Sequence, residues 1–240
     1  AKQGATVTVL EAQDRILARV ATAPIAEHLT AVHQSHGVTV RTGVSIASAA
    51  GNGAVTGLVL GDGEVVDADT VVVGIGVMPN TEVAEAAGLA VNDGIVVDAR
   101  GATADANVWA IGDCTRHPSR IYGRDVRLES VHNAMSQARV VAANVAGKDM
   151  SYDELPWFWS DQYDLKLQIA GLADGHDATV VRGDPSTGSF TVFAMANGCV
   201  IAADSINAMR DHMECRKIAA AQKTVDLSRL ADIQVALKEL

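Results

Sequence analysis

Gly112 and Asp113 close a hydrophobic run that begins at Val108, and they form the pair of residues with the clearest chemical use. The run predicts a buried strand, whose end would place a carboxylate at the carboxyl edge of a sheet, where α/β proteins bind ligands. Glycine lets a ligand approach the backbone closely, and an aspartate accepts hydrogen bonds from polyol hydroxyls. On these residues alone, an ordinary turn with a solvated aspartate is the alternative.

Glu11 is the second candidate, because it ends the short β-branched run from Thr6 to Leu10. Such a run is typical of a buried parallel strand. In a dinucleotide-binding βαβ unit, an acid that binds a ribose follows the glycine fingerprint by about 20 residues. If Glu11 is that acid, the fingerprint would precede Ala1, so we expect the chain to be a fragment. A strand that ends in a solvated glutamate is the alternative.

Histidines and cysteines give weaker signals. The histidines of one predicted helix have no carboxylate or cysteine on the same face, which favours a solvated helix over a metal site. The same interpretation applies to His212 and Cys215 on a later helix. Cys114 beside Asp113 is expected to be a small buried residue rather than a reactive thiol. The residues of the first group are His28, His33 and His36.

The three cysteines are odd in number and show no C-x-x-C spacing. This pattern excludes a disulfide framework, a zinc ribbon and a thioredoxin-type dithiol on this chain. Apolar residues make up 48% of the 240 residues and charged ones 20%, which is typical of a globular protein of about two domains. Apolar runs such as Val71 to Met78 are too short to span a bilayer. The net charge of −10 argues against nucleic acid or an anionic membrane as the main partner, so we expect a soluble, cytoplasmic protein.

The elements that must position these residues follow from hydrophobic periodicity. Pro24 begins a predicted helix that ends at Gly37, and a fully buried strand is expected over Asp69 to Val77. A helix over Val131 to Val145 carries small apolar residues, expected to face the core. Alternation predicts strands in the last third of the chain, followed by a helix from Ala208 to Gln222. These strands span residues 165–171, 179–183, 190–195 and 200–204.

Five segments, taken in chain order, have a specific pattern: Val9-Leu10-Glu11, Gly74-x-Gly76-x-x-Pro79-Asn80, Val108-x-x-x-Gly112-Asp113, Leu128-Glu129-Ser130-Val131-His132-Asn133-Ala134 and Pro156-Trp157-Phe158-Trp159-Ser160-Asp161-Gln162. Together they resemble the FAD-dependent, NADH-utilising ferredoxin and rubredoxin reductases of aromatic-ring dioxygenase and cytochrome P450 systems. The resemblance covers essentially the whole chain. The FAD-binding Rossmann segment and the NADH glycine fingerprint of that family have no counterpart in this sequence.

The resemblance implies an α/β fold: part of a flavoprotein with two dinucleotide-binding domains (three-layer, Rossmann-like), plus a C-terminal α+β domain. Residues 1–80 would be the C-terminal part of the NADH-binding domain. Residues 81–150 would be the second half of the FAD-binding domain, and residues 151–240 the C-terminal reductase domain.

Residue roles are implied by motif position. Glu11 resembles the acid that binds the adenosine ribose of NADH, and it would repel the 2′-phosphate of NADPH. Gly76 and Pro79 match a strand-end loop near the nicotinamide. Gly112 and Asp113 match the aspartate turn that binds the ribityl chain of FAD.

The flavin ring has its own implied contacts. Val131 and His132 open a helix whose positive N-terminus resembles the one facing the pyrimidine edge of the flavin, where it would favour the reduced anionic ring. Trp159 matches an aromatic residue that packs by the isoalloxazine; a plain core tryptophan is the alternative.

The implied function is transfer of electrons from NADH through FAD to a small iron–sulfur ferredoxin or rubredoxin, with no catalytic acid or nucleophile on this chain. Two alternatives remain: a non-catalytic fragment or self-associating C-terminal module without cofactor, and an NADH-dependent disulfide reductase or peroxidase. A homodimer is left open. The only basic cluster is either a solvated loop or a docking patch for an acidic ferredoxin. Its members are Arg116, Arg120, Arg124 and Arg127, with Arg127 expected to matter most.

Overall fold

The computed structural model describes residues 1–240 and divides the chain into two compact units, Ala1–Gly76 and Val77–Leu240. This division falls close to the expected boundary at residue 80. The expected boundary near residue 150 has no counterpart in the two units and stays a prediction. None of the helices is long and apolar enough to cross a bilayer.

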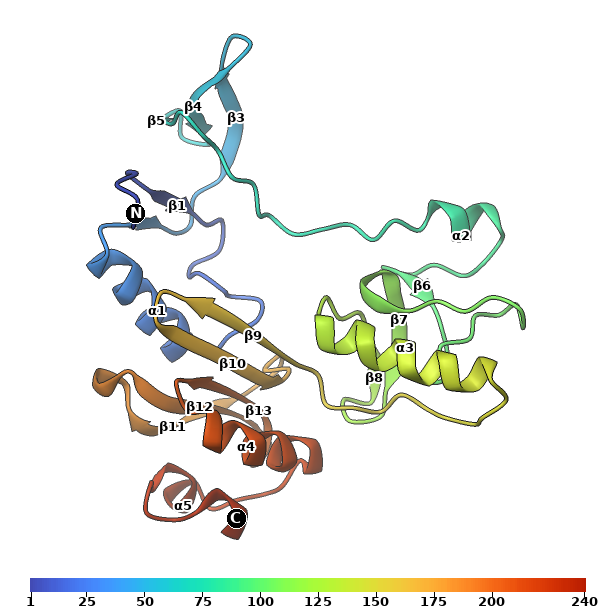
Figure 1. The fold of residues 1–240 in the computed structure, drawn as a ribbon. Helices are drawn as coiled ribbons and strands as arrows, with labels where there is room; N and C mark the ends of the chain where they lie inside the picture. Colours follow the sequence, from blue (N-terminus) through green and yellow to red (C-terminus); the bar gives the residue numbers. More distant parts are fainter. The chain divides into compact units, whose positions relative to one another are not determined.

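The first unit contains a two-stranded parallel sheet, one helix and a three-stranded antiparallel sheet (Figure 1). Strand β1 (Thr8–Leu10) pairs in parallel with β2 (Thr39–Arg41). Helix α1 (Ala23–Ser35) lies between them in sequence and has its proline in the first turn, as predicted. Its buried side consists of Ile25, Ala26 and Leu29. The antiparallel strands are β3 (Ile46–Gly51), β4 (Val55–Leu60) and β5 (Val65–Asp67).

The expectation of a buried strand over Asp69 to Val77 is wrong. This segment forms no strand, and the side chains of Val72 and Val73 are 91% and 71% exposed. A strand interior needs neighbouring strands for its N–H and C=O groups, and no strand of this unit pairs with the segment. Strand β1 was also expected to be a buried parallel strand. It is parallel to β2, but it is only half-buried.

The second unit begins with helix α2 (Glu82–Ala86) and a small sheet in the order β6-β7-β8. Strand β6 (Ile95–Val96) pairs in parallel with β7 (Thr115–Ser119), and β8 (Arg124–Val126) pairs antiparallel with β7. The residues from Val108 to Ile111 were expected to be a buried strand, but they form only an isolated bridge, between Trp109 and Ala102. Val108 and Ile111 are 37% and 40% exposed, so the Gly112-Asp113 pair follows a loop.

Helix α3 (Val131–Val145) has the predicted bounds, but it buries a different face. The buried side is mainly polar: Asn133, Ser136, Gln137, Val140 and Asn144. The apolar residues expected to face the core include Val131 and Met135, which are 58% and 52% exposed. Buried amides must find hydrogen-bond partners. The side-chain amides of Asn133, Gln137 and Asn144 donate to the Leu128 carbonyl, to His117 Nδ1 and to the Arg100 carbonyl, respectively.

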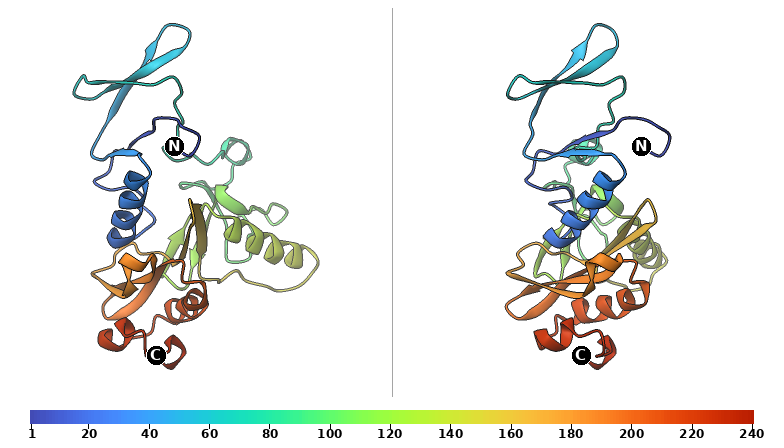
Figure 2. Two further views of the ribbon diagram at one scale, coloured as in Figure 1. Left: turned by 60° about the vertical axis from the view of Figure 1, so that its left-hand side comes forward. Right: turned by 90° about the vertical axis from the view of Figure 1, so that its left-hand side faces the viewer.

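The remaining residues form one antiparallel sheet in the order β11-β12-β13-β10-β9. Its strands are β9 (Trp157–Gln162), β10 (Leu165–Gly171), β11 (Ala178–Asp184), β12 (Ser189–Ala196) and β13 (Cys199–Ile206). Helices α4 (Met209–Ala221) and α5 (Leu227–Ala231) lie on one face of this sheet (Figure 2). Their Ile218 and Leu230 pack with Phe193 in the main core cluster.

One expectation about α4 is wrong, because His212 and Cys215 are buried rather than solvated. Their exposed fractions are 2% and 0%. Burial lowers the pKa of His212 to about 4, with nearby Arg216 adding to the shift. Burial also raises the pKa of the Cys215 thiol to about 12, so this thiol is unreactive near neutral pH.

The small sheet and the large sheet are joined through Tyr122, which follows β7. The Leu172 N–H donates to the Tyr122 hydroxyl at 2.8 Å. Gly171 allows this approach, because a β-carbon there would lie 3.0 Å from the hydroxyl oxygen and 2.5 Å from the Ile201 carbonyl oxygen. Burial raises the pKa of Tyr122 to about 12.

Candidate functional site

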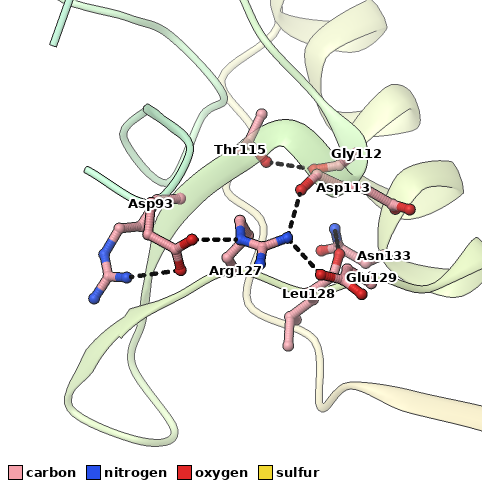
Figure 3. A network of polar contacts seen from close by, with 9 residues as sticks. Asp93, Gly112, Asp113, Thr115, Arg127, Leu128, Glu129 and Asn133 are labelled. Atoms are coloured by element: carbon pink, nitrogen blue, oxygen red, sulfur yellow. Dashed lines mark hydrogen bonds and ion pairs between the residues drawn. The ribbon is translucent and has the colours of Figure 1, made fainter. Parts of the chain in front are cut away.

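The Gly112-Asp113 pair lies in a short 3-10 turn, Gly112–Cys114, immediately before β7. Gly112 has φ +80°, in the left-handed region that favours glycine. Its N–H donates to Gln137 Oε1 at 2.6 Å, so helix α3 holds the turn from the inner side. The side chain of Asp113 is exposed and points away from Arg127 (Figure 3).

The first turn of α3 lies beside this aspartate turn. A β-carbon on Gly112 would lie 3.6 Å from that of Ala134, at ordinary van der Waals distance, so the turn and the helix are close neighbours. Ser130 caps the helix by accepting the Asn133 N–H at 3.1 Å. The amides of Val131 and His132 have no intrahelical acceptor, and the helix dipole makes this end positive. The site can therefore bind an electron-rich group.

An aromatic group continues the site from α3 to β9. The rings of His132 and Trp157 are 5.4 Å apart, and so are those of Trp157 and Trp159. Trp159 is 47% exposed, so it presents a large apolar surface rather than filling the core. The rings of His212 and Trp157 meet edge-on with centroids 5.8 Å apart, and the Arg216 guanidinium carbon lies 5.0 Å from the centroid of the Trp157 ring.

His132 is also held by a carboxylate. Its Nε2 lies 2.7 Å from Glu154 Oε2, which in addition accepts a hydrogen bond from the Ser136 hydroxyl at 3.2 Å. Burial lowers the pKa of His132, although Glu154 acts in the opposite direction. The imidazole is therefore fixed in place beside Trp157.

Five of the residues predicted from sequence thus lie around the first turns of α3: Gly112, Asp113, Val131, His132 and Trp159. The turn contacts α3 directly, and His132 reaches Trp159 through Trp157. Pro79 lies near the start of the same unit, in an extended stretch before α2.

Glu11 and Gly76 belong to the first unit. Glu11 follows β1, is half-buried, and accepts the Gln13 N–H on its carboxylate at 2.8 Å. Gly76 has φ +104°, and the Arg19 guanidinium lies 3.5 Å from where its β-carbon would be. The roles predicted for both residues stay predictions.

Every arginine of the predicted basic cluster forms an ion pair, which offsets the positive charge of the cluster. Arg127 is the least exposed of the four, with 15% of its side chain accessible, and it contacts two carboxylates. The ion pairs are Arg116–Asp93 at 3.8 Å, Arg120–Asp153 at 2.5 Å, Arg124–Asp174 at 2.8 Å, Arg127–Asp93 at 3.2 Å and Arg127–Glu129 at 2.6 Å.

Sequence reasoning missed Gln137, which is 3% exposed and central to the site. Its Oε1 accepts from Gly112 and from the Thr115 hydroxyl, while its Nε2 donates to His117 Nδ1 at 3.0 Å. Burial lowers the pKa of His117 to about 4, which keeps the ring neutral and able to accept. The signal was present, because Asn133, Gln137 and Asn144 recur on one helical face.

The remaining candidates were a metal site and a reactive thiol at Cys114. No group of three histidine, cysteine or acidic side chains is arranged to hold a metal ion. Cys114 is half-buried, with its Sγ 3.6 Å from the Ile111 carbonyl oxygen.

A parallel β-α-β unit in the first unit, and a glycine–aspartate turn beside a helix N-terminus in the second, are features of α/β proteins that bind nucleotides. Residues 1–138 match the model of the pyridine nucleotide-disulphide oxidoreductases, and residues 157–240 match a reductase C-terminal domain. The chain belongs to the pyridine nucleotide-disulphide oxidoreductase family.

Among curated proteins, the ferredoxin reductase subunit of the 5,5'-dehydrodivanillate O-demethylase of Sphingobium sp. is 44% identical over 242 residues, covering 100% of this chain and 59% of that protein. Rhodocoxin reductase of Rhodococcus erythropolis is 44% identical over 239 residues, covering 99% of this chain and 56% of that protein. The chain thus spans less than three fifths of the length of both relatives.

The chain is also similar to solved structures of reductases, and again it spans only part of their length. The ferredoxin reductase for the CYP199A2 system from Rhodopseudomonas palustris superposes with a TM-score of 0.95 at 43% identity, covering 99% of this chain and 59% of that one. The reductase in the covalent putidaredoxin reductase–putidaredoxin complex has a TM-score of 0.94 at 38% identity, covering 99% of this chain and 58% of that one.

Proteins of this family use FAD and NAD(P)H, and the residues present here fit FAD over the part of the cofactor that they would contact. Asp113 offers an exposed acceptor for ribityl hydroxyls. The uncapped amides of α3 suit the electron-rich edge of the flavin ring. Asn133 Oδ1 and His132 Nδ1 are buried without a protein partner, as polar atoms beside a bound group often are.

Proposed function

We propose that this chain is part of an NADH-dependent reductase that delivers electrons to a small iron–sulfur protein of the ferredoxin or rubredoxin type. The observation that carries the proposal is the joint placement of Asp113, the α3 N-terminus and Trp159. When bound, FAD accepts two electrons together and releases them one at a time. Relatives named as ferredoxin, putidaredoxin and rubredoxin reductases support the same partner class.

The residues of this chain would bind and orient rather than transfer protons. The Asp113 carboxylate would accept hydrogen bonds from the ribityl hydroxyls, and the amides of Val131 and His132 would stabilise negative charge at the pyrimidine edge. Trp159 would cover the ring and exclude water from one side. Gly76 and Pro79 would border the nicotinamide, where a glycine permits close approach.

Glu11 would select NADH by accepting hydrogen bonds from the adenosine ribose and repelling a 2′-phosphate. In the chain extended by the amino-terminal segment of its relatives, Glu11→Ala should reduce the preference for NADH over NADPH about tenfold, or about 1.4 kcal/mol, because the repulsion between the carboxylate and a 2′-phosphate is lost. The measurement is the ratio of kcat/KM for the two cofactors. An unchanged ratio would remove Glu11 from the ribose site, and Glu27→Ala on the same unit is the matched control.

Docking of an acidic partner is proposed for the exposed arginines of the basic cluster. The side chain of Arg120 is 81% exposed and that of Arg124 is 49% exposed, whereas that of Arg127 is 15% exposed. Because rim charges act mainly on association rate, Arg120→Ala with Arg124→Ala should slow ferredoxin reduction about threefold at low salt. The difference should vanish at high salt, where the screening length falls to about 3 Å.

Stopped-flow reduction of ferredoxin by the NADH-reduced, extended chain measures this effect and tests the function itself. NADH oxidation by a small neutral acceptor is the control and should not change. If both rates fall together, the loop is structural. If the protein reduces a disulfide or a peroxide but no ferredoxin, the proposed function is wrong.

A further inference from the structure

Arg127 lies where three loops of the second unit meet, and its contacts fit a positioning role better than a docking role. Its Nε donates to Asp93 Oδ1 at 3.2 Å, and its Nη1 donates to Glu129 Oε1 at 2.6 Å. The same Nη1 lies 3.4 Å from the carbonyl oxygen of Asp113 (Figure 3). One guanidinium therefore links the turn at Asp93, the aspartate turn and the segment that leads into α3.

The turn at Asp93 is shaped for this contact. Asp93 has φ +50° and Gly94 has φ +127°, both in the left-handed region. A β-carbon on Gly94 would lie 3.0 Å from the Cys114 carbonyl oxygen and 3.1 Å from Arg127 Cδ. The backbone conformation of Gly94 therefore favours glycine, and a side chain there would press on both Arg127 and the backbone just after Asp113. The second carboxylate oxygen of Asp93 lies 3.8 Å from Arg116, which helps to hold the turn in place.

The aspartate turn is consequently held from two sides. On the inner side, Gln137 Oε1 accepts the Gly112 N–H and the Thr115 hydroxyl. On the outer side, Arg127 donates to the Asp113 carbonyl, and Gly94 lies between the aliphatic part of Arg127 and the Cys114 carbonyl. The Asp113 side chain is exposed, so the region that its carboxylate can reach is set by the position of its own backbone.

We infer that Arg127 is a positioning residue that fixes the backbone of Asp113 against the first turn of α3, and thereby sets the affinity for the ribityl chain of FAD. This inference rests on the proposed function. Arg127 also ties Glu129, next to the Ser130 cap, to the same point, so the aspartate turn and the helix N-terminus keep a fixed spacing. A planar guanidinium can bond several acceptors at fixed angles, which a lysine ammonium does not reproduce.

The test uses the chain extended by the amino-terminal segment of its relatives. Arg127→Met should weaken FAD binding about tenfold, equivalent to about 1.4 kcal/mol. Asp113→Ala should also weaken FAD binding, and the double variant should bind no worse than Asp113→Ala alone, because Arg127 acts through Asp113. Arg127→Lys should be impaired as well, despite its charge. The matched control is Arg100→Met, which removes another exposed ion pair of the same unit, to Asp149.

A second measurement needs no cofactor and covers the case in which Arg127→Met disturbs folding. In the 240-residue chain, Arg127→Lys should speed hydrogen exchange of the amides at Asp113 to Thr115, while exchange in β12 and β13 stays unchanged. Unchanged exchange together with unchanged FAD affinity would overturn the inference, as would additive losses in the double variant. If Arg127→Met slowed only ferredoxin reduction, docking would be its role. If Asp113→Ala left FAD binding unchanged, the proposed site would be wrong and the inference would fall with it.

Discussion

The 240-residue chain by itself should bind FAD weakly and should emerge colourless from gel filtration, whereas the chain extended by the amino-terminal segment of its relatives should be yellow. FAD affinity depends heavily on its pyrophosphate, which a glycine fingerprint at a helix N-terminus holds. The sequence contains no such fingerprint. Asp113, the α3 amides and Trp159 address only the ribityl chain and the ring.

Titration with two flavins distinguishes the absence of a pyrophosphate site from a general loss of structure as the cause of weak FAD binding. Because Asp113, the α3 amides and Trp159 address only the ribityl chain and the ring, which riboflavin and FAD share, the 240-residue chain should bind the two with affinities within about threefold, a difference of less than 1 kcal/mol. The extended chain should prefer FAD strongly. Fluorescence quenching of each flavin measures both constants. Stoichiometric, tightly bound FAD on the 240-residue chain would show that the residues described here form a sufficient site.

The exposed apolar residues point to the same dependence on further contacts. Val131 and Met135 on α3 are more than half exposed, and so are Val72 and Val73 in the first unit. Their apolar surface is free to contact other segments. These residues explain why sequence patterns overestimated burial: the pattern records what a segment can bury, and contacts with other segments decide whether it does.

The C-terminal sheet could be predicted from sequence because its signals are local. Strand β10 runs from Leu165 to Gly171, as expected from alternation and the flanking turns, and β12 and β13 extend the predicted strands by one or two residues at each end. By contrast, the apolar runs at Asp69 to Val77 and Val108 to Ile111 can become strands only if a neighbouring strand pairs with their backbone groups. The residues of a run do not reveal whether such a neighbouring strand exists.

The site was predictable in part for the same reason. The glycine–aspartate pair and the start of the helix at Val131 are local signals, so they could be recognised. The contacts of Arg127 were not, because Asp93 is 34 residues away in sequence and Asp113 is 14 residues away. A basic cluster in sequence therefore suggested a free positive patch, whereas folding brings a carboxylate to each arginine.

Replacing Arg182 should cause the largest loss of stability among the arginines of the chain. Arg182 lies on β11 with 6% of its side chain exposed and donates to Asp211 at 3.5 Å. It also donates to three carbonyl oxygens of the C-terminal segment: Leu230 at 3.2 Å, Asp232 at 2.6 Å and Val235 at 2.8 Å. Arg182→Met would leave these acceptors without their donor, so the free energy of unfolding should fall by about 3–5 kcal/mol.

Arg182→Met should also loosen the segment after α5 under conditions in which the rest of the chain stays folded. Arg182 is the main polar link between the large sheet and the segment after α5, so amides near Val235 should exchange faster in Arg182→Met under native conditions. Arg229→Met is the matched control, because Arg229 is exposed and makes one long contact, 3.4 Å to the Glu239 carbonyl oxygen. Urea unfolding should place that control within about 0.5 kcal/mol of the parent chain. Equal effects of the two substitutions would mean that α5 is held by the apolar contacts of Leu230 alone, and that the buried guanidinium adds nothing to them.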